Sequence, residues 1–380
     1  MYKNLSYWEH STFFSGYDVI IIGSGIVGLS AALHLKHQQP KLKVGILEAG
    51  FLPSGASTKN AGFACFGSVS ELLDELQEST EEEVLEVVEM RWKGLLKLKE
   101  TLGTKAIDYQ QLGGYEIFKQ ENKAYSEECV GQISYLNKLL KKVTGEHDIY
   151  SVASDKIAGF GFSNVHSMIM NRCEAQIDTG KMMSALTSTI RGLGVGILNN
   201  CEFLSMEKSN HEFILSTNQG EFRTKKVIMA SNAFIGRFYP ELNITPGRGQ
   251  VLVTEFIPNL QINGTFHYDK GYYYFRNINN RILLGGGRNI NFEAEATTEP
   301  GLTDPVQAAL EDLLYQTIIP NQKAKIEYRW SGVMAFGDNL SPIIKRIEPH
   351  VFCAVRCNGM GVAMGSLSGE EVAKLVLNDL

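Results

Sequence analysis

Three glycines and one glutamate near the start of the chain have the spacing of a dinucleotide-binding site. The sequence reads Gly23-Ser-Gly25-Ile-Val-Gly28, and Glu48 follows twenty residues after the third glycine. Gly23 permits a tight turn, Gly25 lets the backbone approach a pyrophosphate, and Gly28 lets a helix pack closely on a strand. A carboxylate at Glu48 would accept hydrogen bonds from an adenosine ribose and would disfavour a 2′-phosphate. The chemistry indicated is therefore the binding of a dinucleotide without that phosphate.

The elements around these residues supply the context that the motif requires. Residues 17–22 form a β-branched run typical of a buried parallel strand, and residues 29–36 predict a helix. Residues 43–48 predict a second strand that ends at Glu48. A strand that leads into the glycines and a helix that leads out of them form a βαβ unit. Its helix N-terminus offers free N–H groups and a positive dipole end to an anion.

The rest of the chain changes from parallel βαβ to antiparallel patterns and back. We predict helices over residues 70–102, 121–142, 178–193 and 367–377, with Asp178 or Thr179 as an N-cap, and strands over residues 113–118, 226–230 and 351–355. Residues 249–288 predict several strands, with a hairpin at Asn279 and Asn280. The fold class expected is α/β with an α+β insert. A discontinuous Rossmann-like nucleotide-binding domain would span residues 1–85, 171–240 and 326–380, and an antiparallel-sheet substrate domain residues 86–170 and 241–325.

Composition narrows the classes of partner and the compartment. The chain has 380 residues, a net charge of −6 and a pI near 5.8, which disfavours nucleic acid as a partner. The N-terminal segment lacks the apolar core of a signal peptide, and glycines interrupt residues 19–35, so we expect no membrane span. Its six cysteines have no CxxC spacing, which predicts reduced thiols, no metal site and a cytoplasmic location.

Several segments in a fixed order resemble the flavoenzyme family of glycine oxidase, D-amino-acid oxidase and sarcosine oxidase. Besides the glycine motif with Glu48, they are residues 55–63, 175–186, 227–236, 246–255, 281–288, 330–332 and 358–365. The resemblance implies an FAD-binding domain and an FAD-dependent oxidoreductase. Such an enzyme oxidises a C–N bond of a small amine or amino acid by hydride transfer to flavin N5.

The resemblance also implies where the cofactor binds. Ser57 and Thr58 would bond phosphate oxygens, residues 62–64 would pass the isoalloxazine, and residues 359–363 would face its N1–C2=O edge. Asn60 stands where relatives with a histidyl link have His, so FAD is expected to bind non-covalently. The full set of expected cofactor residues is Gly23, Gly25, Ile26, Val27, Gly28, Glu48, Ala49, Ser57, Thr58, Lys59, Asn60, Gly62, Phe63, Ala64, Phe203, Ser231, Asn232, Asn358, Gly359, Met360, Gly361, Val362 and Ala363.

The substrate site departs from the family pattern at one place. Amino-acid oxidases of the group carry an Arg shortly after Trp-x-Gly that pairs with the substrate carboxylate, but Met334 stands there in this chain. Either the substrate lacks an α-carboxylate or another cation serves, for which Arg356 is the first candidate, before Arg288 and Arg276. Tyr273 matches a family position near the substrate. Period-2 alternation puts Tyr273 and Phe275 on one face of their strand, opposite Tyr272 and Tyr274.

Hydride transfer to a flavin requires no side-chain base, so we assign no catalytic residue. Two alternatives stay open from the sequence. One is an NAD-linked dehydrogenase, because the glycine motif alone suits either dinucleotide. The other is a flavin-binding protein without turnover, which Met334 in place of the Arg would suit. The electron acceptor is left open between oxygen, quinones and carrier proteins.

Overall fold

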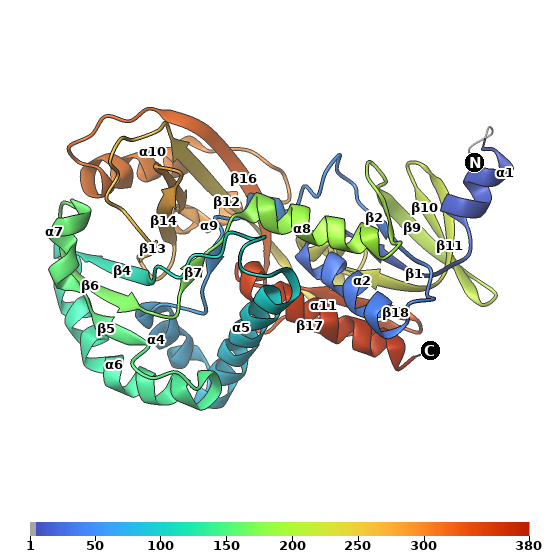
Figure 1. The fold of residues 1–380 in the computed structure, drawn as a ribbon, viewed down its shortest axis with the longest axis horizontal. Helices are drawn as coiled ribbons and strands as arrows, with labels where there is room; N and C mark the ends of the chain where they lie inside the picture. The colour runs from blue at the N-terminus through green and yellow to red at the C-terminus, as the bar shows by residue number, and fades with distance from the viewer. Residues whose placement is uncertain (1–4, 380) are drawn as a thin grey trace.

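A sheet of apolar strands, mostly parallel, organises the first of two units in the computed structural model, which describes residues 5–379 (Figure 1). β1 (Tyr17–Ile22) lies at its centre, parallel to β2 (Val44–Leu47) on one side and to β11 (Gly220–Met229) on the other. The parallel strands β8 (Gly196–Leu198) and β18 (Val351–Val355) extend the sheet, and the antiparallel β17 (Ile343–Glu348) ends it. β1 and β2 can be buried on both faces because their residues are nearly all apolar.

Alternation along β1 divides the core of the first unit into two layers. Val19 and Ile21 pack in one cluster with helices α2 (Ile26–Gln38), α5 (Glu81–Leu102), α8 (Thr179–Gly192) and α11 (Gly361–Leu377). Ile20 and Ile22 pack in the other, with the antiparallel strands β9 (Phe203–Ser209) and β10 (Glu212–Thr217). The first unit is therefore a three-layer sandwich, and the short α1 (Tyr7–Glu9) lies at its far end (Figure 1).

A second mixed sheet forms the other unit. Its order is β16 (Ile326–Phe336), β12 (Thr245–Thr254), β15 (Arg281–Gly286), β14 (Tyr273–Ile278), β13 (Thr265–Tyr268), β4 (Gly114–Lys119), β6 (Val165–Asn171) and β5 (Tyr150–Val152). One face packs on α10 (Asp304–Leu313), and the β4–β6 end packs on α4 (Val69–Glu78) and α6 (Lys123–Thr144). The opposite face, at β12, β15 and β14, contacts Ala61 and Phe63 of the first unit.

Short elements connect the two units. The two-stranded ribbon of β3 (Phe63–Ala64) and β7 (Ala175–Gln176) runs between them, and α3 (Ala56–Lys59) precedes it. α7 (Ile157–Phe160) and α9 (Phe292–Glu295) are single turns in the second unit. These connections bring loops from both units to the carboxyl ends of β1 and β2, where ligands of doubly wound sheets bind.

Most predicted elements are present, and their differences from prediction have local causes. The strand at residues 17–22, the N-cap at Asp178 and the hairpin at Asn279–Asn280 are confirmed, the last with positive φ at both residues. The helices predicted from residues 29 and 367 begin earlier, at Ile26 and Gly361. Gly28 packs closely on the Gly23 turn, and Gly365 packs on α2, so neither glycine ends its helix. Residues 70–102 form two helices, each starting with a capping box.

The sheet of the second unit includes one segment that the predicted domain limits give to the first. Residues 326–336 form β16, which pairs with β12 from Thr245↔Phe336 to Thr254↔Ile326. In the part of the chain that the structure describes, no helix is both long enough and apolar enough to cross a membrane.

Alanine at two helical glycines should have opposite effects on stability, because one glycine lies where α5 crosses α11 and the other lies on an open helix surface. A Cβ on Gly94 of α5 would overlap the Ala363 carbonyl oxygen, whereas one on Gly131 of α6 would have open space around it. We expect Gly94→Ala to lower the free energy of unfolding by about 1–3 kcal/mol through overpacking. Gly131→Ala should raise it by about 0.5–1 kcal/mol through helix propensity. Urea denaturation followed by circular dichroism measures both, and equal effects would contradict the packing interpretation.

Candidate cofactor and substrate site

The turn after β1 has a geometry that requires its glycines. Gly23 has φ +106°, and a Cβ there would come within 2.8 Å of the Ala230 carbonyl oxygen. A Cβ on Gly28 would overlap the Gly23 carbonyl oxygen, and Gly25 is the N-cap of α2. Ile26 is buried and Val27 half-buried in the first turn of this helix. The backbone N–H groups in the first turn of α2 have no acceptor within the helix.

Glu48 is fixed at the end of β2 by four donors. Its carboxylate accepts hydrogen bonds from Ser24 N and Oγ at 3.0 and 2.7 Å, from Gly50 N at 2.9 Å and from Ser54 Oγ at 3.1 Å. The side chain is 7% exposed, while the next residue, Ala49, is exposed. Glu48 is thus a preformed acceptor beside the glycine turn.

The loop 55–62 folds back over the start of α2. Ser57 Oγ accepts a hydrogen bond from Ile26 N at 2.9 Å, so this hydroxyl lies at the helix N-terminus. Thr58 Oγ1 instead donates to the Pro53 carbonyl at 2.7 Å. Asn60 donates to the carbonyls of the preceding turn and accepts from Gly62 N at 2.9 Å and Thr179 Oγ1 at 2.8 Å. The Lys59 carbonyl accepts from Trp330 Nε1 at 2.9 Å, which ties the loop to β16.

The C-terminal loop meets this loop from the other side. Asn358 and Gly359 have positive φ, and the helix α11 begins at Gly361, with Val362 and Ala363 buried in its first turn. Met360 Sδ lies 3.9 Å from Cys65 Sγ, and a Cβ on Gly359 would be 3.7 Å from Met334 Sδ. Residues near 62–65, 334 and 360 therefore converge beside the starts of α2 and α11.

Three other predicted cofactor residues lie beneath this region. Phe203 begins β9 and packs on Phe238, with ring centroids 4.8 Å apart. Ser231 follows β11 next to Gly23, and its Oγ is buried with no hydrogen-bond partner among residues 5–379. Asn232 Oδ1 accepts from Arg356 N at 3.1 Å. A buried hydroxyl without a partner beside the glycine turn fits a ligand that would supply one.

The face of the second sheet that looks toward Phe63 carries Tyr274, not Tyr273. The rings of Tyr274 and Phe63 meet edge to face at 5.6 Å, and a Cβ on Gly249 would lie 2.9 Å from Met334 Cε and 3.9 Å from Tyr274 Oη. Tyr273 packs in the core cluster on the opposite face, together with Phe275. The alternation predicted for this strand is confirmed, and it puts Tyr274, Met334 and Gly249 on one wall.

The three candidate arginines have different surroundings. Arg356 donates to Asn339 Oδ1 at 2.7 Å and twice to the Ser341 carbonyl, at 3.1 and 2.8 Å. Its guanidinium is therefore occupied by the loop between β16 and β17. Arg276 is 4% exposed beside Gly62, and burial lowers its pKa to about 10.

Arg288 is stacked between two aromatic rings, 3.9 Å from the centroid of Phe336 and 4.8 Å from that of Phe292. Within residues 5–379 no hydrogen bond or ion pair engages its guanidinium. Burial lowers its pKa. Its Nη1 would lie 3.3 Å from a Cβ on Gly247, the register partner of Met334. Arg288 therefore reaches the same wall as Met334 and Tyr274 with its donors free.

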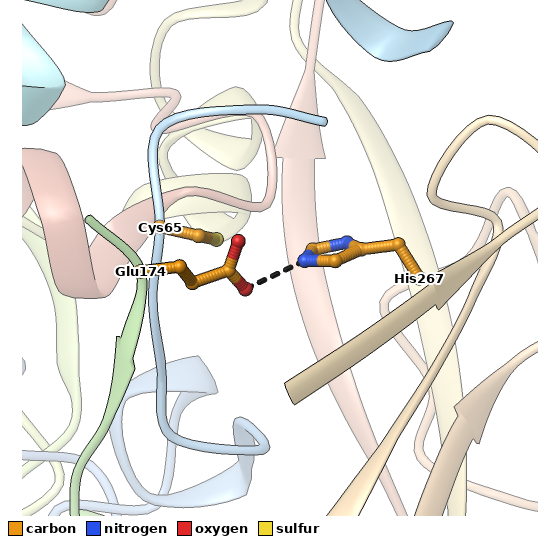
Figure 2. Close-up of side chains that lie close together, drawn as sticks. All are labelled: Cys65, Glu174 and His267. Atoms are coloured by element: carbon orange, nitrogen blue, oxygen red, sulfur yellow. Dashed lines mark hydrogen bonds and ion pairs between the residues drawn. The ribbon is translucent and has the colours of Figure 1, made fainter. Parts of the chain in front are cut away.

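A buried cluster next to Phe63 joins residues far apart in the sequence (Figure 2). His267 Nε2 donates to Glu174 Oε1 at 2.6 Å. The atoms of Cys65, Glu174 and His267 that could ligate a metal all lie within 4.8 Å of one another. Glu174 and His267 bond each other directly, and burial raises the pKa of Cys65 well above its usual range. We therefore interpret the cluster as an ion pair beside a protonated thiol.

Neighbouring carboxylates set the charge of this cluster. Burial by itself lowers the pKa of His267, but Glu174, Glu71 and Glu116 together raise it to about 9, so His267 is protonated at neutral pH. Burial raises the pKa of Glu116 to about 7 against the hydrogen bonds from Ser70. Because the folded-state pKa of His267 is raised, the pair stabilises the fold at neutral pH. That contribution is lost as pH rises through about 9.

The fold and this site are those of a dinucleotide-binding protein with a separate second sheet, and comparisons with known proteins specify the class. Residues 18–375 match the sequence profile of the family described as FAD dependent oxidoreductase (DAO). The chain is 26% identical to gamma-glutamylputrescine oxidoreductase of Escherichia coli over 95% of this chain and 84% of that protein. It is 23% identical to glycine oxidase of Bacillus subtilis over 95% and 93%.

Solved structures give the same fold. Glycine oxidase of Geobacillus kaustophilus matches with a TM-score of 0.75 and 19% identity, over 96% of this chain and 95% of that one. L-proline dehydrogenase of P. horikoshii matches with a TM-score of 0.73 and 18% identity, over 96% and 94%. The chain belongs to the DAO family of FAD-dependent oxidoreductases. It is an FAD enzyme that acts on amines or amino acids, as predicted from the resemblance, and the NAD-linked and non-catalytic alternatives are not favoured.

Sequence reasoning did not single out two features of the site. Alternation along the strand puts Tyr274 and Tyr273 on opposite faces, but the pattern alone does not say which face meets the other unit. Glu174 and His267 are 93 residues apart and form no spacing motif, so the sequence alone does not pair them. Residues 171–178 are mostly polar in the sequence, so nothing there indicates that Glu174 is buried and requires a partner.

Glu48 provides a direct test of the nucleotide site. Replacing Glu48 by Gln removes the negative charge that adenosine hydroxyls would meet and should weaken FAD binding about tenfold. A matched control is Glu89→Gln on α5, whose carboxylate pairs with Lys93 in solvent and should leave FAD affinity unchanged. Quenching of flavin fluorescence on binding measures both. Equal FAD affinity in the two variants would show that Glu48 serves only the Ser24 and Ser54 contacts.

Proposed function

We propose that the chain holds one FAD non-covalently between the glycine turn and residues 358–363, and that it oxidises the C–N bond of a carboxylate-bearing small amine or amino acid. When bound, FAD supplies the hydride-accepting atom N5. In this proposal the FAD-binding domain comprises residues 5–68, α5 (Glu81–Leu102), residues 171–240 and residues 337–379, because α5 packs in the core of the first unit. The remaining segments, including β16, form the substrate domain.

The observation that carries this proposal is the convergence of three distant segments. Residues 59–65, 332–334 and 359–360 come together through the contacts of Gly359 with Met334, Met360 with Cys65, and Gly332 with Lys59. They lie beside the N-termini of α2 and α11, whose dipoles favour an electron-rich group. A tightly held cofactor needs contacts from distant segments in this way.

The proposed cofactor residues would bind different parts of FAD through different interactions. The N–H groups at the start of α2, together with Ser57, would bind the pyrophosphate, and Glu48 would accept the ribose hydroxyls. The partnerless hydroxyl of Ser231 would gain a partner there. Non-covalent binding is supported because Asn60 is an amide held by four hydrogen bonds, and Cys65 is a buried thiol with a raised pKa.

The proposed substrate wall is the face of Tyr274, Met334 and Gly249. Glycine at position 249 leaves Met334 Cε and Tyr274 Oη bordering the same space. An aromatic ring and a thioether form an apolar surface against which a neutral amine can be desolvated and oriented. We assign substrate contact to Tyr274 in place of Tyr273, because the Tyr273 ring lies in the core behind the sheet.

Arg288 is the proposed partner of the substrate carboxylate. The Arg356 guanidinium is hydrogen-bonded to Asn339 and Ser341. The Arg288 guanidinium lies next to the Met334 position and has no hydrogen-bond partner among residues 5–379. The two rings hold the guanidinium between them, and its N–H donors have no hydrogen-bond partner in the part of the chain that the structure describes, so they can bind a carboxylate. The relatives named for glycine and for γ-glutamylputrescine fit a class of amines of different size.

We also propose a cytoplasmic location and no nucleic-acid partner. All six cysteines are free and buried, as expected for a protein kept in a reducing compartment. The net charge of −6 disfavours a phosphate backbone as a ligand.

Anaerobic mixing tests the reaction itself. The purified protein should be yellow, and its flavin absorbance should bleach with members of a panel of D-amino acids, N-methyl amino acids and polyamines. Bleaching requires a donor whose C–H bond lies beside an amine nitrogen, so matched alcohols are the control. A colourless preparation that ignores added FAD, or a yellow one that no amine bleaches, would refute the proposed function.

The role of Arg288 predicts a selective defect. Arg288→Met should raise KM for the carboxylate-bearing substrates about 10- to 100-fold, because one partner of a desolvated ion pair is lost. Amines without a carboxylate should be unaffected. Arg281→Gln on the same hairpin is the control, since Arg281 pairs with Glu327 at the surface. A uniform loss of rate on all amines would indicate damage to the wall instead of a lost carboxylate contact.

A further inference from the structure

The loop proposed to border the flavin is carried by a very short ribbon. Phe63 pairs with Gln176 and Ala64 with Ala175, and Ile177 N donates to the Gly62 carbonyl at 2.8 Å. Two paired residues form a marginal ribbon on their own. The position of Gly62–Ala64 therefore depends on what holds residues 175–177.

Glu174, directly before β7, holds the ribbon to the second sheet. Its Oε1 accepts hydrogen bonds from His267 Nε2 at 2.6 Å and from Thr265 Oγ1 at 2.7 Å, and both donors belong to β13. The carboxylate is buried, with the residue 1% exposed. Hydrogen bonds between charged groups in a buried place are the strong ones. One carboxylate thus fixes the ribbon against a strand of the other unit.

His267 also contacts the loop itself. Its ring meets the Phe63 ring edge to face, with centroids 5.3 Å apart, and Phe63 meets Tyr274 in the same manner. The charged or titratable groups that face His267 come from four elements: Glu174 before β7, Glu71 of α4 at 3.7 Å from Nδ1, Glu116 of β4, and Cys65 after β3. With three carboxylates around it, the imidazole is held as a cation.

We propose that Glu174 and His267 are positioning residues for the FAD site: their ion pair fixes the β3–β7 ribbon and Phe63 against β13, so that cofactor affinity depends on the protonation of His267. The proposal rests on the proposed function, in which Gly62–Ala64 border the flavin. The contacts given above place neither residue on the wall formed by Tyr274, Met334 and Gly249.

The expected pH dependence follows from the charges. The pKa of His267 is raised to about 9, so the pair is intact at neutral pH. Above this value the imidazole loses its proton, and Glu174 and Glu71 face each other without the cation between them. FAD affinity should therefore fall as pH rises through about 9.

The test measures FAD release from the loaded protein, by flavin fluorescence after dilution, between pH 7 and pH 10. For the unaltered chain we expect the dissociation constant to rise about tenfold across the step. His267→Gln and Glu174→Gln, which keep hydrogen-bonding groups but remove the charge, should already show the weaker binding at pH 7 and no step. His350→Gln is the control, because His350 pairs with Asp379 at 2.7 Å near the surface of the first unit and should leave both the affinity and its pH step unchanged.

Circular dichroism would show whether each variant folds. The pH series on the unaltered chain tests the proposal even if a variant does not fold. A flat FAD affinity between pH 7 and pH 10, or a step that persists in His267→Gln, would overturn it. A lowered melting temperature with unchanged FAD affinity would mean that the pair only stabilises the fold, which also overturns it. A protein that binds no FAD at pH 7 would instead refute the proposed function.

Discussion

Close contacts between backbones, which only glycine permits, set the geometry on which the site depends. Where α2 and α11 run together, a Cβ on Gly369 would meet the Val27 carbonyl oxygen at 2.5 Å, and one on Gly365 would meet Ile26 at 2.7 Å. Gly365 lies beside the first residue of α2 and Gly369 one turn further along both helices, so the two helices are parallel. Their positive ends therefore open on the same space, and their fields add there.

The second unit supplies what the first lacks. The first offers a glycine turn, a fixed carboxylate at Glu48 and two helix ends, which together recognise a dinucleotide but say nothing about the molecule to be oxidised. The wall of Tyr274, Met334 and Gly249 belongs to an antiparallel sheet whose other face is a packed core. That core fixes the strands, and the strands hold the wall residues in place.

Much of the nucleotide side could be predicted from the sequence, whereas the substrate side could not. The strand at residues 17–22, the turn and Glu48 are local, and their spacing determines their geometry. The start of α11 was predicted too late because Gly361 and Gly365 have poor helix propensity, and the close packing of α2 that accounts for Gly365 is not visible in the sequence. Which arginine is free depends on loops that fold against each other: Arg356 is occupied by Asn339 and Ser341, and no pattern within residues 326–356 predicts that contact.

The strand β16 has a consequence for how a substrate reaches the wall. Trp330 bonds the Lys59 carbonyl and Met334 lies against Gly359, so one strand is fastened to both loops of the first unit. A hinge opening between the units would have to break both fastenings and the buried Glu174–His267 contact. The segment around Arg288 is exposed, with Ile290 43% and Phe292 44% exposed, and it borders the wall through the contact of Arg288 with Phe336 of β16. Small substrates should therefore reach the wall past this exposed segment, without a separation of the two units.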